Sequence, residues 1–181
     1  MSDHTPSHST FLVGERVTLR PLEPADVPML SRAANDPETR YPLFRFLPCS
    51  DEAIRRQIEE WDRDPHTVML AICERPTGRA IGNTGLVRID WVSGAAIFFI
   101  AIADPEDWSK GFGGEATRLI SDYAFDTLNL QRIQLHVWAK NERGVKAYQR
   151  AGFEIEGTLR RAMYHAGEHE DFLVMAKLRP M

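Results

Sequence analysis

A glycine-rich turn directly before a long amphipathic helix is the feature that most constrains this fold. Residues 108–117 read W-S-K-G-F-G-G-E-A-T, and Gly111, Gly113 and Gly114 fall within four positions. Because glycine has no Cβ, the backbone of such a turn can approach a ligand closely. The helix that follows presents free N–H groups and a partial positive charge at its first turn. The combination predicts an anion site, and phosphate is the usual anion at such sites.

The hydrophobic pattern predicts a helix after this turn and strands before it. Upstream, Thr67–Cys73, Ala80–Arg88 and Ala95–Ala103 are strand-like runs separated by short turns, which predicts an antiparallel meander. Ala95–Ala103 is almost wholly apolar, so we expect a central strand buried on both faces. Downstream, apolar side chains recur at spacings of mostly three and four, as on an amphipathic helix: Phe112, Ala116, Leu119, Ile120, Tyr123, Ala124 and Leu128.

The remaining segments complete an α+β pattern. Further strands are expected at residues 17–22, 132–138, 153–157 (with a continuation toward 162) and 171–178, and further helices at residues 23–34, 50–61 and 141–151. Asn141 is a suitable N-cap for the last helix, and Gly152 a suitable C-terminal stop. The sequence thus predicts a mixed, mostly antiparallel central sheet of about seven strands with about four helices.

Composition and charge exclude several classes of function. The net charge is −4 and no stretch concentrates Lys and Arg, so no nucleic-acid partner is expected. No apolar run approaches the roughly 18 residues of a membrane span. Cys49 and Cys73 form no C-x-x-C pair, which suits a reducing compartment and offers no metal site. Residues 1–10 are polar, lack the pattern of a signal peptide and are expected to be a flexible tail before a single domain at 11–181, in a cytoplasmic protein.

Three phosphate-binding templates can be compared with the turn. The P-loop needs Gly-Lys-Ser/Thr, which does not occur in this sequence. The dinucleotide fingerprint fits residues 111–116 formally, but antiparallel strands precede the turn and the strand after it has no acid at its tip. The third template, the pyrophosphate loop of the GNAT superfamily of N-acetyltransferases, is Gln/Arg-x-x-Gly-x-Gly/Ala at the start of a long helix. Residues 108–113 resemble it, with Trp108 in place of the polar first residue.

Two further segments carry the same resemblance. Residues 141–154 are similar to the family's N-x-x-A-x-x-x-Y-x-x-x-G-F segment, with Gly144 in place of alanine. Residues 157–171 and the opening 17–22 resemble the branch that contains ribosomal-protein N-terminal acetyltransferases (the RimJ/RimL group) and spermidine acetyltransferase. The resemblance runs from about residue 14 to the end of the chain. It implies a three-layer α/β/α fold, acetyl-CoA as cosubstrate and direct transfer to an amine within a ternary complex. This branch often forms homodimers.

The resemblance also implies site residues. Tyr148 matches the family's general acid, and an ordinary phenol pKa near 10 suits donation to a thiolate; packing of its ring in the core is the alternative. Asn141 either contacts CoA or only caps its helix. Trp108 leaves a polar contact to the pyrophosphate missing, which backbone N–H groups and Lys110 would supply. No metal site is expected. The residues expected to bind the cosubstrate are Ala101, Ile102, Ala103, Trp108, Lys110, Gly111, Phe112, Gly113, Gly114, Glu115 and Asn141.

The acceptor and the general base stay open at this level. The acceptor is a protein N-terminus, a polyamine, an amino sugar or another small amine, and residues 39–61 and 158–168 are expected to select it. Candidates for the base by residue type are Asp90, Glu106, His136 and Tyr164, and a relay of waters is another route. A non-catalytic acyl-CoA-binding module on the same fold is the alternative to an enzyme.

Overall fold

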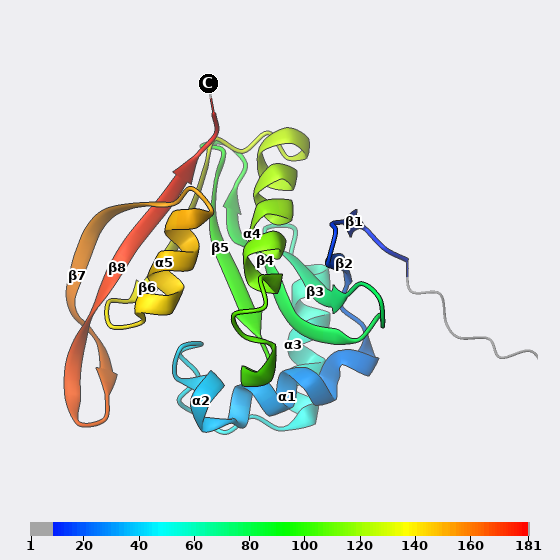
Figure 1. The fold of residues 1–181 in the computed structure, drawn as a ribbon, viewed down its shortest axis with the longest axis horizontal. Coiled ribbons are helices and arrows are strands. Elements are labelled where there is room, and N and C mark those ends of the chain that lie inside the picture. Colours follow the sequence, from blue (N-terminus) through cyan, green and yellow to red (C-terminus); the bar gives the residue numbers. More distant parts are fainter. Residues whose placement is uncertain (1–8, 181) are drawn as a thin grey trace, which may run out of the picture.

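One twisted sheet runs through the whole described part of the chain, residues 9–180 of a computed structural model (Figure 1). Within these residues eight strands lie in the order β1-β2-β3-β4-β5-β6-β8-β7, and all neighbours are antiparallel except β5 and β6. The strands are β1 (Leu12–Val13), β2 (Val17–Pro21), β3 (Val68–Glu74), β4 (Ala80–Asp90), β5 (Ala95–Ile102), β6 (Arg132–Trp138), β7 (Glu154–His165) and β8 (Glu168–Leu178).

Helices cover both faces of the sheet. They are α1 (Val27–Asn35), α2 (Pro37–Arg40), α3 (Asp51–Arg63), α4 (Phe112–Asp122) and α5 (Glu142–Arg150), with short 3-10 turns at Pro24–Asp26 and Pro105–Asp107. Phe98 of β5 packs in the main core with α4, whereas the next residue, Phe99, faces α1 and α3. Successive strand residues point to opposite faces. The predicted three-layer α/β/α arrangement and the antiparallel meander β3-β4-β5 are therefore confirmed.

The sheet splits between β5 and β6. These two strands are parallel neighbours only where Ala95–Ile97 pair with Arg132–Gln134. Beyond Ile97 they diverge, and α5 lies over the gap (Figure 1). The end of β5 therefore keeps one free edge inside the molecule, and this edge is where the candidate site lies.

A buried ion pair ties β2 to the start of the helical layer. Arg20 donates two hydrogen bonds to the Asp26 carboxylate, both of 2.8 Å, and Asp26 also accepts from the Glu23 N–H at 2.9 Å. The side chains are 6% and 2% exposed. The pair is therefore removed from water on both sides.

Several details differ from the sequence prediction. The sheet gains the two-residue β1, and α2 adds a turn of helix between the helices expected at residues 23–34 and 50–61. The long helix after the glycine turn ends as α4 at Asp122 and continues as a π-helix over Tyr123–Thr127. β7 takes up the expected continuation toward 162 and ends at His165. The expectation for β5 was wrong on one face, because Ile100 and Ile102 are only half-buried where they border a cavity.

Candidate active site

The glycine turn is built around a backbone conformation that favours glycine. Gly111 is the N-cap of α4 with φ of +88°, a left-handed value that is strained for other residues. The first helical hydrogen bond runs from Glu115 N to the Gly111 carbonyl. The N–H groups of Phe112, Gly113 and Gly114 precede it and have no partner inside the helix. Because Gly113 and Gly114 line a cavity, these donors lie at its edge.

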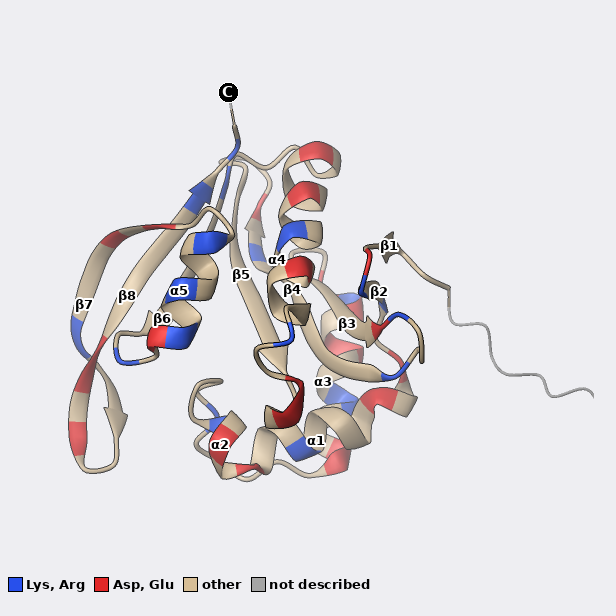
Figure 2. Cartoon of the chain, viewed as in Figure 1, with Lys and Arg blue, Asp and Glu red and all other residues tan. Residues whose placement is uncertain are grey.

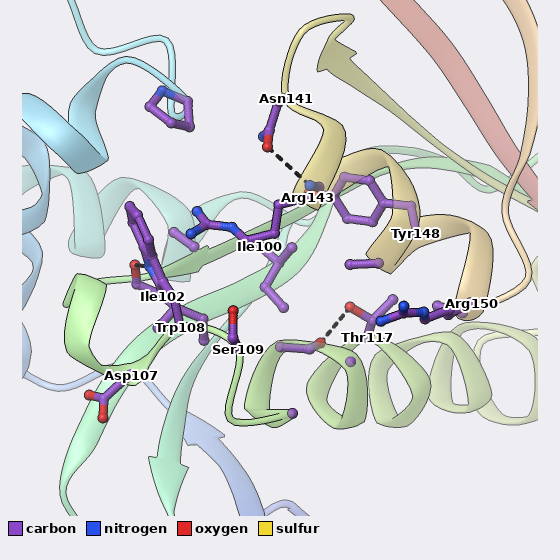
Figure 3. Close-up of a pocket in the computed structure, with 18 of the residues that line it drawn as sticks. Ile100, Ile102, Asp107, Trp108, Ser109, Thr117, Asn141, Arg143, Tyr148 and Arg150 are labelled. Atoms are coloured by element: carbon purple, nitrogen blue, oxygen red, sulfur yellow. Dashed lines mark hydrogen bonds between the residues drawn. The ribbon is translucent and has the colours of Figure 1, made fainter.

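The cavity has a volume of about 650 Å³ and joins the glycine turn to α5. Its walls come from the end of β5, residues 107–109 and Gly111, the first two turns of α4, the inner face of α5, Thr39 of α2, and Pro42 and Leu43 after it. Figure 3 shows Ile100 and Ile102 between the two helices, with Trp108 on one side and Tyr148 on the other. The volume falls in the range of small-molecule and cofactor sites.

The lining of this cavity is positively charged, although the chain as a whole carries −4. Its cations are Arg118, Arg143, Arg150 and Lys177, and α5 carries basic positions along its length (Figure 2). Asp107 supplies the carboxylate of the lining, and it is already neutralised. Two hydrogen bonds of 2.9 Å from Arg79 and one of 3.0 Å from Lys110 hold the pKa of that carboxyl below its usual range. The cavity therefore suits a multiply charged anion.

The backbone N–H and C=O groups on the free edge of β5 are those of its even-numbered residues. Ala103 N donates to the Ile81 carbonyl at 2.9 Å, which directs the backbone of Ala103 toward β4. Backbone direction alternates along a strand, so Ala101 also faces β4, and Ile100 and Ile102 face the gap. Ala103 is not among the cavity residues and packs against the α1–α3 cluster. Of the three expected residues only Ile102 has its backbone at the gap; Ile100 was missed, although counting alternate residues would have found it.

Tyr148 combines the two alternatives considered for it. Its ring packs edge-on to Phe98 and Phe153, with centroid distances of 6.3 and 6.0 Å, and it also lines the cavity. Burial raises the pKa of Tyr148 to about 12. Asn141 likewise does two things: its Oδ1 accepts from Gly144 N at 3.0 Å, which caps α5, and it lines the cavity. A Cβ at Gly144 would lie 2.7 Å from the Asn141 amide nitrogen, so glycine makes room for this cap.

Three other residues expected to bind the cosubstrate point elsewhere. Phe112 is buried in the main core. Lys110 turns toward Asp107 rather than into the cavity. Glu115 accepts hydrogen bonds from the N–H groups of Glu15 and Arg16, the latter at 3.1 and 3.2 Å. Glu115 thus fastens the segment before β2 to α4. A carboxylate so engaged is not free for a ligand.

The candidates for the general base also lie outside the cavity lining. A hydrogen bond from the Ser93 side chain, together with the N–H groups of Ser93 and Val92, keeps the pKa of Asp90 low in a turn. His136 is exposed and stacks on Phe172, and Tyr164 is exposed near the β7–β8 turn beside His169. Glu106 is exposed in the 3-10 turn after β5.

Aromatic side chains connect the segment after α2 with the strands beyond the split, and we call this cluster the aromatic bridge. Tyr41 meets the His165 ring edge-on at 4.4 Å, and Phe44 meets Phe172 at 4.6 Å. Trp138 also contacts His165, with a centroid distance of 5.1 Å. These contacts connect the segment after α2 with β6, β7 and β8, and Tyr41, Phe44 and His165 belong to the two regions expected to select the acceptor. Trp138 Nε1 and His165 Nδ1 are buried there without a hydrogen-bond partner among the described residues.

Sequence reasoning missed the cavity cations. A usable signal was present, because Arg143 and Arg150 lie seven residues apart and so share one helix face. Arg118 lies four residues after Gly114, which is one helical turn, so the two share one face of α4. The structure shows no cluster of metal-ligating side chains among residues 9–180, and no helix in this range is long and apolar enough to cross a membrane.

The site combines a glycine turn in a cationic cavity, a split sheet and a cavity-lining tyrosine. The sequence model of the acetyltransferase (GNAT) domain family matches residues 16–154. The chain belongs to the GNAT family and is an acetyl-CoA-dependent N-acetyltransferase. The resemblance noted in the sequence is thereby confirmed at the level of the family.

Individual relatives show what the chain is similar to within the family. The spermidine N(1)-acetyltransferase of Escherichia coli strain K12 is 30% identical over 164 residues, 88% of this chain and 84% of that protein. A putative ribosomal N-acetyltransferase of Bacillus subtilis is 29% identical over 177 residues, 94% of this chain and 95% of that protein. The spermidine N-acetyltransferase of Vibrio cholerae, solved in complex with CoA and spermine, superposes with a TM-score of 0.85 at 27% identity, covering 92% of this chain and 97% of that one.

Proposed function

We propose that this protein transfers the acetyl group of acetyl-CoA to a primary amine by direct attack in a ternary complex. One observation carries the proposal: a single cavity connects the cationic glycine turn to the free edge of β5 and to Tyr148. The turn and its cations suit the diphosphate of CoA, and the β5 edge suits the amide groups of its pantetheine arm. The thioester would then lie in the split, within reach of a proton donor.

The chemistry assigns a separate task to each group. The neutral amine nitrogen attacks the thioester carbonyl carbon, a tetrahedral oxyanion forms, and the C–S bond breaks as the carbonyl returns. Tyr148 donates its proton to the departing sulfur. The attacking nitrogen loses a proton to water, since no base candidate lines the cavity. Tyr148 regains its proton from solvent after CoA leaves.

The acceptor is a small amine or a protein N-terminus that reaches the split from the aromatic bridge. The relatives support both classes, because some are named for spermidine and another for ribosomal acetylation. The test is a panel of spermidine, spermine, single-amine compounds and short peptides with free N-termini, scored by release of CoA. We expect turnover with at least one class. Tight acetyl-CoA binding with no turnover on any amine would favour a non-catalytic binding module.

The pH profile tests the protonation state of Tyr148. A general acid must carry its proton, and an ordinary tyrosine would lose it above about pH 10. Since the pKa of Tyr148 is raised to about 12, its proton is kept further into the alkaline range. With a peptide acceptor, kcat/KM should rise as the N-terminal amine deprotonates near about pH 8 and then stay level to about pH 11.

Two controls keep this profile interpretable. Circular dichroism at each pH checks that the protein stays folded. A fall in kcat/KM with an apparent pKa near about 10 that is absent from a Tyr148→Phe variant would contradict the raised pKa of Tyr148, although it would support the acid role.

A further inference from the structure

Trp108 and Arg143 form a contact that joins the two sides of the cavity. The Arg143 guanidinium carbon lies 3.7 Å from the centroid of the Trp108 ring, within the range of a cation–π interaction. Trp108 is held in place because its Nε1–H donates to the Ile102 carbonyl at 3.1 Å. Figure 3 shows Arg143 reaching from the start of α5 toward the indole, with Ser109 and the first turn of α4 on the other side.

Arg143, Arg150 and Lys177 line the cavity without a carboxylate partner among the described residues, and of these three Arg143 is the one held on an aromatic ring. Asp107 forms ion pairs with Arg79 and Lys110, and Arg118 forms one with Asp122 at 3.6 Å. Within the described part of the chain, no carboxylate forms an ion pair with Arg143. The residue is exposed overall, and burial of part of its side chain lowers the pKa of Arg143. An unpaired cation that is held on a ring at a cavity wall favours an anionic ligand.

The placement indicates which anion. The guanidinium held on the indole lines the same cavity as Gly111, Gly113 and Gly114, whose turn presents its N–H groups there. An anion between them would receive backbone donors from α4 on one side and a planar set of N–H donors on the other. A diphosphate, with oxygens on two phosphorus atoms, can engage both at once.

We propose that Arg143, positioned on the face of Trp108, is the side-chain ligand for the diphosphate of the cosubstrate. The inference rests on the proposed function and deepens it. Trp108 contributes a platform in place of a polar side chain, and the charge comes from α5 instead. The glycine turn and the start of α5, which are far apart in sequence, would therefore bind the diphosphate together. This arrangement also makes the start of α5, and with it Asn141 and Tyr148, sensitive to whether the diphosphate is bound.

The test compares ligands with and without the diphosphate. Arg143→Met keeps a flexible apolar stem over the indole and removes the charge. By calorimetry we expect this variant to bind CoA and dephospho-CoA about tenfold to a hundredfold more weakly than wild type, and pantetheine unchanged. Arg143→Lys should recover only part of the loss, because an ammonium lacks the planar fork. Lys146→Met, on the exposed face of the same helix, is the matched control for charge and should leave all three ligands unaffected.

The indole platform has its own test. Trp108→Phe retains a ring face, whereas Trp108→Leu removes it, so only the leucine variant should weaken CoA binding strongly. Combining Trp108→Leu with Arg143→Met should add little to either change alone, since both remove one interaction.

Each contrary outcome has a distinct meaning. Equal weakening of CoA and pantetheine by Arg143→Met would show a general collapse of the cavity. Weaker binding of CoA with unchanged binding of dephospho-CoA would place the Arg143 contact at the 3′-phosphate. Affinities of Arg143→Met within about twofold of wild type would mean that the Trp108–Arg143 contact only stabilises the structure. Each of these overturns the inference while wild-type turnover leaves the proposed function standing. A wild-type protein that binds no CoA would overturn both.

Discussion

Replacing Tyr148 with phenylalanine is expected to lower the rate of CoA release by at least about a hundredfold, because general acid catalysis typically contributes about 10²–10⁴ in rate. The substitution removes the hydroxyl and leaves the ring packed against Phe98 and Phe153. Affinity for CoA should therefore stay within about twofold of wild type. Steady-state kinetics with the best acceptor of the panel, together with calorimetry for CoA, separates the two quantities.

Tyr123→Phe provides the matched control. Burial also raises the pKa of Tyr123, and its ring packs edge-on to Phe11 at 5.1 Å, but it does not line the cavity. Loss of this hydroxyl should leave turnover unchanged. An unchanged rate in Tyr148→Phe would remove Tyr148 from the acid role, and equal losses in both variants would point to a general effect of losing a buried hydroxyl.

The largest expected effect on stability comes from Arg20. Arg20→Met leaves the Asp26 carboxylate 2% exposed and without its cation, and breaking such a buried pair typically costs about 3–5 kcal/mol in the free energy of unfolding. Urea unfolding followed by circular dichroism measures this loss. A double variant, Arg20→Met with Asp26→Leu, should recover much of it, since the unpaired charge is then absent.

An exposed pair serves as the comparison for this variant. Arg63 and Glu59 lie 3.3 Å apart on α3 with side chains 76% and 53% exposed, so Arg63→Met should change stability by less than about 1 kcal/mol. A loss below about 1 kcal/mol for Arg20→Met as well would mean that water or a rearranged side chain compensates Asp26.

The sequence predicted those elements whose conformation depends mainly on residues within the same segment. The positive φ of Gly111, the α4 helix at Phe112–Asp122, the Asn141 cap and the strand at Arg132–Trp138 all follow from nearby residue types. The role of the turn in diphosphate binding and the candidate acid Tyr148 came from the resemblance to the family. The bounds of β7 and the half-buried face of β5 were missed, because strand length and burial depend on neighbouring strands and on a cavity.

By itself, then, the sequence determined the glycine turn, its helix, the α5 segment and hence the family, since these depend on backbone preferences and spacing along one stretch of chain. Only the tertiary structure decided which side chains share the cavity. Glu115 and Lys110 lie next to the turn in sequence, yet they face Arg16 and Asp107. Arg143, distant in sequence, reaches Trp108 because the split between β5 and β6 brings α5 across the turn. The physical reason is that helix and strand geometry fixes direction locally, whereas burial and charge pairing are set by segments that meet only after folding.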